Sequence, residues 1–106
     1  MLDVVHKVKE AAAKKILFLP HAIDQMNRPE RLITPAEVRE IIMEGYVIED
    51  YPSDPRGHSC LIIGRMSAER VVHVVCSPKE DYLAVITAYL PSTDEWNQDL
   101  RTRKKT

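Results

Sequence analysis

The sequence has few of the residues that define several common protein classes. Only three glycines and two cysteines occur among its 106 residues. Cys60 and Cys76 each lie inside an apolar run and form no Cys-x-x-Cys, which is typical of small buried side chains rather than of disulfide frameworks or metal pairs. The sequence also lacks a Gly-rich phosphate loop, a Gly-x-Ser-x-Gly elbow and a dinucleotide fingerprint, so it gives no support to the classes that these motifs define.

Long apolar runs and an excess of one charge are lacking as well. No apolar run approaches the ~20 residues that span a bilayer, and residues 1–15 are too charged for the apolar region of a signal peptide. We therefore expect a cytoplasmic protein with no membrane partner. The formal net charge is −1, whereas nucleic-acid binders are usually basic. Residues 101–106 carry four positive charges and fit either a phosphate-contacting end or a solvated tail.

Helical spacing of apolar residues predicts three helices in the first half of the chain. The first covers residues 3–17, and the second covers residues 21–27 between two prolines. The third covers residues 35–44, because a Thr-Pro-Ala-Glu capping box opens it and Gly45 supplies a left-handed end.

The second half of the chain predicts a sheet. Strands are expected where β-prone residues lie between short turns, at residues 46–51, 59–66, 71–76 and 82–89. Turns are expected at residues 67–70 and 77–81, and residues 93–95 are expected to open a short helix that carries Trp96. The expected fold class is α+β, with the N-terminal helices packed on one face of a three- or four-stranded antiparallel sheet.

His73 interrupts an otherwise apolar strand and is the first candidate site residue. Its side chain shares a face with Val71 and Val75, and simple turns would place Gly64 and Val85 opposite it. A histidine in a central strand costs free energy unless its ring nitrogens find partners. His73 is therefore either a hydrogen-bonded core histidine or an acid or base in a cleft between the sheet and a helix.

His21, at the start of the second helix, is either a capping or surface histidine or a second acid or base. His6 and His58 lie in polar surroundings and receive no role. The histidine spacings match no zinc pattern and no acidic cluster completes one, so we expect neither a metal nor another cofactor.

Three arginines and a tyrosine complete the set that the residues suggest. Arg65 ends a strand, and Arg28 and Arg31 follow the second helix. Each guanidinium group either binds phosphate by a bidentate contact or is a solvated surface group. Tyr89 ends the last strand, where its hydroxyl group either meets a ligand or lies at the edge of the core.

Several segments together resemble the bacterial domain-of-unknown-function family numbered 4258. They are HAIDQMNRPERLITPAEVREII, GYVIEDYPSDPRGHSCLIIGR, RVVHVVCSPKEDYLAVITAYLPSTDEW and RTRKK. The family is typified by a His-Ala-x-x-Arg-Met start, a Gly-x-Val-Ile-Glu-x-Tyr strand, a His-Val-Val strand, an Ile-Thr-x-Tyr strand and a Trp followed by paired arginines. The residues that match these motifs are His21, His73, Thr87, Tyr89, Trp96, Arg101 and Arg103.

The resemblance implies a single domain over residues 1–106, with an N-terminal helix in residues 1–20, a family-like core over 21–103 and a basic tail at 104–106. It also implies a fold similar to the RelE- and barnase-like group of small ribonucleases, and some members of the resembled family lie beside antitoxin genes; this is fold-level analogy. Gln25 departs from the motif, where the family usually has arginine, so Arg28 or Arg31 would have to replace it.

Two functions remain open. The first is a metal-independent endoribonuclease toxin of the mRNA interferase type, whose partners are RNA and a cognate antitoxin protein. His21 and His73 would be its base and acid in either order, Arg65 or a tail arginine would stabilise charge, and Tyr89 would orient the phosphate. The RNA contacts would come from Arg28, Arg31, Thr87, Arg101 and Arg103. The second is a non-catalytic protein- or RNA-binding domain, a degenerate toxin or antitoxin-like partner, which the near-neutral charge and Gln25 favour.

Overall fold

The computed structural model describes residues 2–66 and 70–105, so most of the predicted turn at 67–70 lies outside the described residues. Along the chain, the elements are α1 (Leu2–Lys14), β1 (Ile16–Phe18), α2 (Pro20–Met26), α3 (Pro35–Glu44), β2 (Tyr46–Tyr51), β3 (Ser59–Arg65), β4 (Val71–Pro78) and β5 (Leu83–Tyr89). In the described part of the chain, no helix is both long and apolar enough to cross a membrane.

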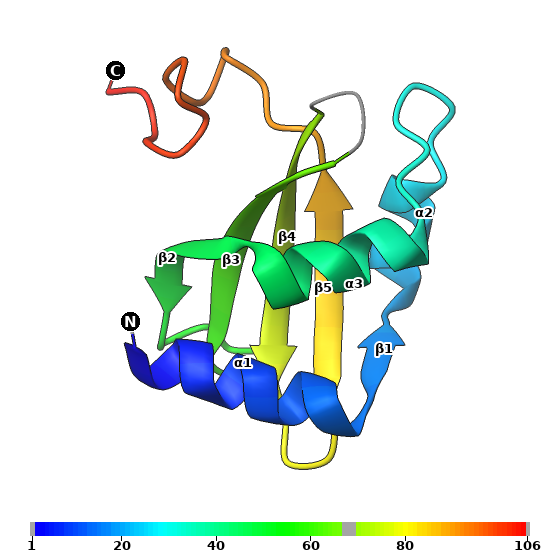
Figure 1. Cartoon of the computed structure of the whole chain (residues 1–106). Coiled ribbons are helices and arrows are strands. Elements are labelled where there is room, and N and C mark those ends of the chain that lie inside the picture. Colours follow the sequence, from blue (N-terminus) through cyan, green and yellow to red (C-terminus); the bar gives the residue numbers. More distant parts are fainter. Residues whose placement is uncertain (1, 67–69, 106) are drawn as a thin grey trace.

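The five strands form one mixed sheet in the order β1-β5-β4-β3-β2 (Figure 1). The α+β class is confirmed, but the prediction of three or four antiparallel strands is wrong. Residues 16 and 17, expected as the end of the first helix, belong to β1, which runs parallel to β5. The N–H of Leu83 bonds the carbonyl of Lys15, and the N–H of Leu19 bonds the carbonyl of Val85, at 2.8 and 3.1 Å. Long-range pairing therefore overrides the helical spacing of this segment.

The bounds of the third helix agree with the prediction. Its C-terminal end does not, because Gly45 is extended with φ −80°, so the predicted left-handed conformation is wrong. The N-terminal cap is the predicted one. The hydroxyl oxygen of Thr34 accepts from the backbone N–H of Glu37 at 3.1 Å, and the Glu37 carboxylate accepts from the N–H of Thr34 at 2.9 Å. At the other end of α3, the ammonium group of Lys9 donates to the carbonyls of Ile42, at 3.0 Å, and Met43. A side chain from α1 thus satisfies carbonyls that every helix end leaves free.

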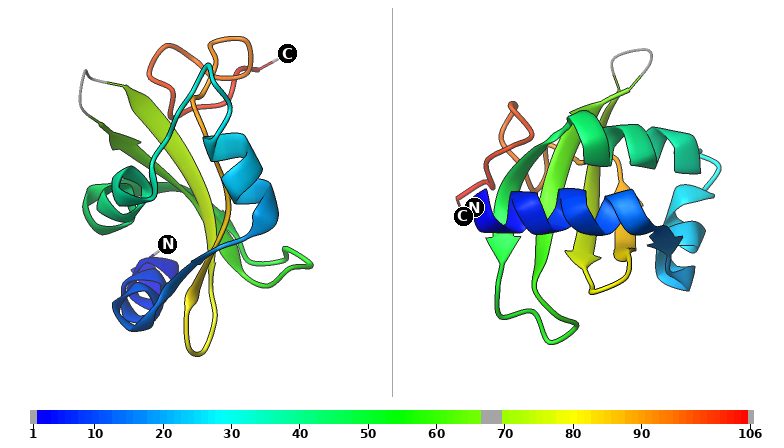
Figure 2. Two further views of the ribbon diagram at one scale, coloured as in Figure 1. Left: turned by 90° about the vertical axis from the view of Figure 1, so that its right-hand side faces the viewer. Right: turned by 60° about the horizontal axis from the view of Figure 1, so that its bottom comes forward.

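Helices α1 and α3 lie across one face of the sheet, and α2 lies near the edge of the sheet that β1 and β5 form (Figure 2). The core between these helices and the sheet contains buried apolar side chains from alternate strand positions, including Val72, Val74 and Cys76 of β4. His73 and Val75 point to the opposite face, because successive side chains of a strand alternate. Residues after β5 cover part of that second face, where Trp96 is buried against the His73 ring with the centroids 4.6 Å apart.

The register around His73 differs from the expected one. Ile63 and Tyr89 lie opposite His73, whereas Gly64 pairs with Val72 and Val85 pairs with Cys76. Strand β4 continues to Pro78, and a bulge lies beside Cys76, so the simple turn geometry assumed from the sequence does not apply. The predicted partners Gly64 and Val85 are therefore wrong.

The segment after β5 also differs from its prediction. Residues 93–95 form a turn and not a helix, since the N–H groups of Glu95 and Trp96 both bond the carbonyl of Ser92 and the chain then reverses. Trp96 next pairs with Arg103 in an isolated antiparallel bridge. Tertiary contacts of the tryptophan thus replace the expected helix.

Gly64 lets α3 approach the sheet closely, which leads to a stability prediction. A Cβ atom at this position would lie 2.7 and 2.9 Å from Cγ1 and Cγ2 of Ile41. Overpacking of this kind typically costs about 1–3 kcal/mol. We expect Gly64→Ala to lower the free energy of unfolding, measured by urea denaturation, by about that amount.

The control is a double-mutant cycle with Ile41→Ala, which removes the atoms that the new methyl group would meet. Gly64→Ala should cost clearly less in that background than in the wild type. Equal costs in the two backgrounds would show that Ile41 does not set the constraint.

Candidate functional site

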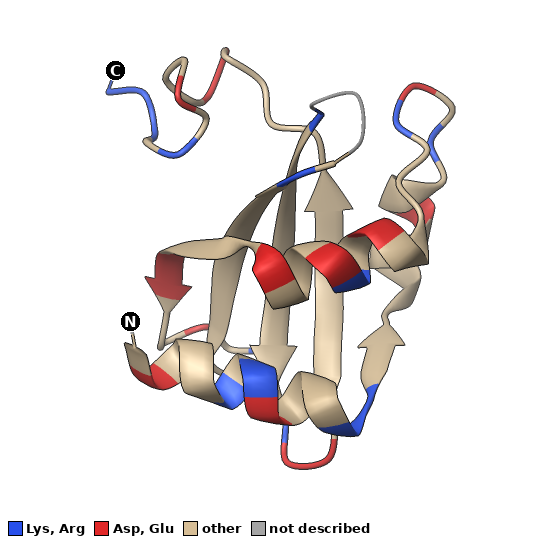
Figure 3. Ribbon diagram, in the orientation of Figure 1, with Lys and Arg blue, Asp and Glu red and all other residues tan. Residues whose placement is uncertain are grey.

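A hollow with a volume of about 460 Å³ lies between α2, the end of β5 and the segment after β5. It is lined by His21, Gln25, Arg31, Thr87, Tyr89, Leu90, Ser92, Glu95, Trp96 and Arg103, and we call it the His21 hollow. Figure 3 shows Lys and Arg in the C-terminal segment and in the loop after α2, whereas the visible face of α3 is mainly acidic.

Five of the predicted site residues meet in this hollow: His21, Arg31, Thr87, Tyr89 and Arg103. Thr87 and Tyr89 are two positions apart on β5 and therefore share a face of the sheet. His21 is exposed in the first turn of α2, directly after Pro20 at the helix start. Residues far apart in the sequence thus line one solvent-reachable surface.

Arg31 reaches the hollow because Gln25 holds it. Its Nη1 donates to Oε1 of Gln25 at 2.7 Å. Its backbone is fixed as well, since its N–H bonds the carbonyl of Arg28 and its carbonyl accepts from the Arg70 side chain. The Arg31 guanidinium therefore stands beside the position where the family motif usually has arginine. Arg28 instead faces Glu30 at 3.9 Å and does not line the hollow.

His73 does not line the hollow, contrary to the expectation that both imidazoles open into it. Its side chain is 0% exposed. Its Nε2 lies 2.7 Å from the carbonyl oxygen of Leu100, and its Nδ1 lies 3.2 Å from the hydroxyl group of Tyr89. A carbonyl oxygen only accepts, so Nε2 carries the hydrogen and Nδ1 of the neutral ring accepts from Tyr89. The link from His73 to the hollow is thus indirect and passes through Tyr89.

Arg103 enters the hollow from the C-terminal segment and is fixed by two contacts. Its Nε and Nη2 donate to both carboxylate oxygens of Glu49 at 3.0–3.2 Å, and its guanidinium carbon lies 4.5 Å from the centroid of the Trp96 ring. The hydrogen bonds to Glu49 and Tyr51 raise the pKa of Arg103 further above its usual value. Burial and the bond to Glu49 raise the pKa of Tyr51 to about 12, so its hydroxyl stays a donor.

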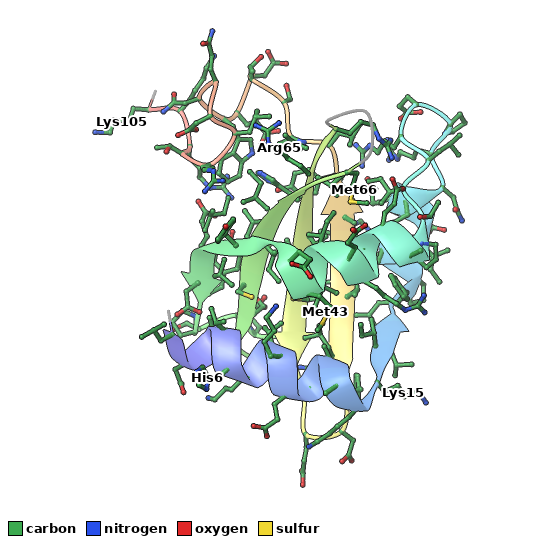
Figure 4. All side chains as sticks on the ribbon, in the orientation of Figure 1. His6, Lys15, Met43, Arg65, Met66 and Lys105 are labelled. Carbon is green, nitrogen blue, oxygen red and sulfur yellow. The ribbon has the colours of Figure 1, made fainter. Side chains whose placement is uncertain are left out.

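Arg65 and Arg101 lie away from His21. They line a second hollow of about 330 Å³ near the end of α3, together with the carboxylates of Glu40, Glu44 and Asp99. Figure 4 labels Arg65 near the end of β3, close to the C-terminal segment. Neither guanidinium lines the His21 hollow, so the structure does not bring these two arginines together with His21.

Glu95 was missed as a site residue by the sequence reasoning. It contributes the one carboxylate among the residues that line the His21 hollow. Its position directly before Trp96, which matches the family motif, is the feature of the sequence that points to it. Residues 93–95, however, predict the start of a helix and not a site. As for metals, no group of three or more His, Cys, Asp or Glu side chains within residues 2–66 and 70–105 is placed to hold an ion.

The burial of His73 predicts a pH dependence of stability. Burial lowers the pKa of His73 in the folded chain, against smaller opposing effects of the Leu100 bond and Glu49. The unfolded chain, in which histidine has a pKa of about 6.5, therefore binds the proton more readily. This contribution to stability is complete above about pH 6.5 and is lost as the pH falls below it, at up to about 1.4 kcal/mol per pH unit.

The measurement is urea denaturation of the wild type and of His73→Asn from about pH 8 to about pH 5. Subtracting the two curves removes the other titrating groups. The wild type should lose more stability than the variant on acidification. Parallel curves would show that His73 is not buried in its neutral form.

In a comparison with family models, residues 18–90 match the family described as Domain of unknown function (DUF4258). The match includes His21, Arg31, His73, Thr87 and Tyr89, and it ends before the segment that supplies Glu95, Trp96 and Arg103. Searches of curated proteins and of solved structures returned no match. Because the matched residues make up more than half of the chain, the chain belongs to the DUF4258 family.

Proposed function

We propose that this protein is a metal-independent endoribonuclease of the toxin type, which binds a phosphodiester of RNA in the His21 hollow. The observation that supports this proposal is the meeting of one imidazole, two guanidinium groups and several hydroxyl groups in one hollow. Guanidinium groups bind phosphate by paired hydrogen bonds, and imidazole transfers protons near neutral pH. A fold similar to the RelE and barnase-like ribonucleases, a cytoplasmic location and a cognate antitoxin belong to the same proposal.

Phosphate binding is assigned to Arg31 and Arg103. Both are oriented by neutral or acidic partners, Gln25 and Glu49, that leave part of each guanidinium group free for a ligand. Thr87 lines the same hollow and adds a hydroxyl group. Because Glu49 pairs with Arg103 and the Glu95 carboxylate also lines the hollow, phosphate binding rests on the directed hydrogen bonds of the two guanidinium groups and not on an excess of positive charge.

Cleavage is assigned to transfer of protons at the two oxygens that flank the phosphorus. One group removes the proton of the 2′-hydroxyl, whose oxygen attacks the phosphorus, and another protonates the departing 5′-oxygen. The products are a 2′,3′-cyclic phosphate and a free 5′-hydroxyl. His21 is the imidazole that lines the hollow, so it supplies one of these two transfers.

A non-catalytic RNA- or protein-binding domain is the second candidate. The burial of His73 favours it, because the expected second imidazole does not reach a ligand directly. In that case RNA would bind in the hollow without being cut.

His21→Ala tests the catalytic proposal. Loss of a general acid or base typically lowers the rate by roughly 10²- to 10⁴-fold. We expect this loss in the cleavage of a fluorescent RNA oligonucleotide, together with loss of growth arrest when the protein is expressed without a partner. His6→Ala is the matched control, since His6 is exposed on α1 and lies outside the hollow. Equal cleavage by His21→Ala and the wild type would refute the role of His21.

Arg31→Ala and Arg28→Ala test phosphate binding as a matched pair from one loop. Arg31→Ala should weaken RNA binding for all sequences alike and reduce the slope of log affinity against log salt by about 1, because one phosphate contact is lost. Arg28→Ala should change neither quantity. Fluorescence anisotropy at several salt concentrations measures both, and an equal loss in the two variants would place the RNA outside the hollow.

A further inference from the structure

Tyr89 joins the buried His73 to the His21 hollow. The tyrosine lines the hollow, and its hydroxyl group donates to Nδ1 of His73, because Nε2 of that ring already donates to the carbonyl of Leu100. The proton of the phenol is thus directed away from the hollow, and its oxygen lone pairs remain available as acceptors. A group that accepts a proton from a ligand in the hollow needs its hydroxyl group to be oriented in this direction.

We propose that Tyr89 is the general base of RNA cleavage and that His73 is the positioning residue that receives the phenol proton. This inference rests on the proposed function. It also assigns His21 as the acid, since the base is supplied from the other side of the hollow.

The proton transfers balance in a single step. The phenol oxygen of Tyr89 takes the proton of the 2′-hydroxyl while its own proton moves to Nδ1 of His73. The 2′-oxygen forms a bond to phosphorus, the bond from phosphorus to the 5′-oxygen breaks, and protonated His21 gives its proton to that oxygen. His73 is then an imidazolium that donates to Tyr89 and Leu100, and it returns its extra proton through Tyr89 to solvent.

The hydrogen-bond partners of His73 fit this relay in both protonation states. The Leu100 carbonyl accepts from Nε2 before and after the transfer, so the ring need not turn. Burial lowers the pKa of His73 and makes the imidazolium short-lived, which favours return of the proton; the Leu100 carbonyl and Glu49 on β2 favour the imidazolium, and Arg103 in the C-terminal segment opposes it. Burial raises the pKa of Tyr89, so the phenol keeps the proton that it must pass on. The Trp96 ring packs edge-on against the imidazole and holds its plane.

Glu95 is the competing base, because its carboxylate lines the same hollow. It is exposed, and it lies in the turn after β5. Tyr89 is instead fixed by the sheet on one side and by a hydrogen bond on the other, which is the preorganisation that catalytic groups require. Substituting each residue separately distinguishes the two bases.

The experiment measures kcat and RNA affinity for Tyr89→Phe, His73→Asn and Glu95→Gln, with Tyr46→Phe as the matched control. Tyr46 is exposed and lies outside the His21 hollow. Tyr89→Phe removes a single oxygen atom and should lower kcat roughly 10²- to 10⁴-fold with little change in affinity. His73→Asn places an amide oxygen where Nδ1 was, so it can accept from Tyr89 but cannot take its proton, and it should lower kcat similarly.

A pH profile separates the relay from a purely structural role. Burial lowers the pKa of His73 below the ordinary histidine value of about 6.5. The wild-type rate should therefore fall in the acidic range as His73 becomes protonated, and His73→Asn should lack this decline. Should His73→Asn not fold, as judged by its near-ultraviolet circular dichroism, Tyr89→Phe and the wild-type profile carry the test.

Wild-type kcat in Tyr89→Phe would overturn the relay and leave the nuclease standing. A large loss in Glu95→Gln with little loss in Tyr89→Phe would transfer the role of base to the carboxylate. Binding of RNA without cleavage by the wild type would overturn the proposed nuclease, and the relay with it.

Discussion

The two hydrogen bonds of one buried imidazole connect the sheet to the C-terminal segment. His73 bonds Tyr89 on the neighbouring strand and the Leu100 carbonyl in the tail, at 3.2 and 2.7 Å. A buried imidazole without hydrogen-bond partners would cost free energy. The C-terminal segment must therefore return to the sheet, where the Leu100 carbonyl stabilises His73 in its strand. That return buries Trp96 and brings Arg103 to the hollow. The candidate site therefore depends on an interaction that lies beneath it.

Specific partners hold the two guanidinium groups of the hollow in place. Arg103 is bound by Glu49 and stacked on Trp96, and Arg31 is held by Gln25. These partners restrict the two long side chains, so less conformational freedom remains to be lost when a phosphate binds. A nearly neutral protein can in this way offer directed guanidinium donors to a ligand. Acidic side chains lie at the hollow too, at Glu95 and Glu49, and others lie on α3 (Figure 3).

The two faces of the sheet differ in the side chains that they carry. One face is covered by α1 and α3 and is filled by apolar side chains, with Gly64 allowing α3 to approach. The other face carries the polar side chains of His73, on β4, and of Thr87 and Tyr89, on the adjacent strand β5. The bulge beside Cys76 shifts the pairing by one residue, and beyond it Tyr89 stands opposite His73. Without the bulge, regular pairing of β4 with β5 from the same turn would have placed a residue other than Tyr89 opposite His73.

Local signals in the sequence determined α3, the four antiparallel strands and the presence of His73 on a strand, because caps, turns and side-chain alternation act within a few residues. The sequence also showed that Gln25 departs from its motif, which led to Arg31. The sequence could not predict strand β1, since three residues are too few to show a periodic pattern of apolar side chains. They form a strand only because they pair with β5. Arg65 and Arg103 looked alike in sequence, yet the fold placed only Arg103 beside His21. Register and the path of the tail decided this, and both are set by contacts between residues far apart in the chain.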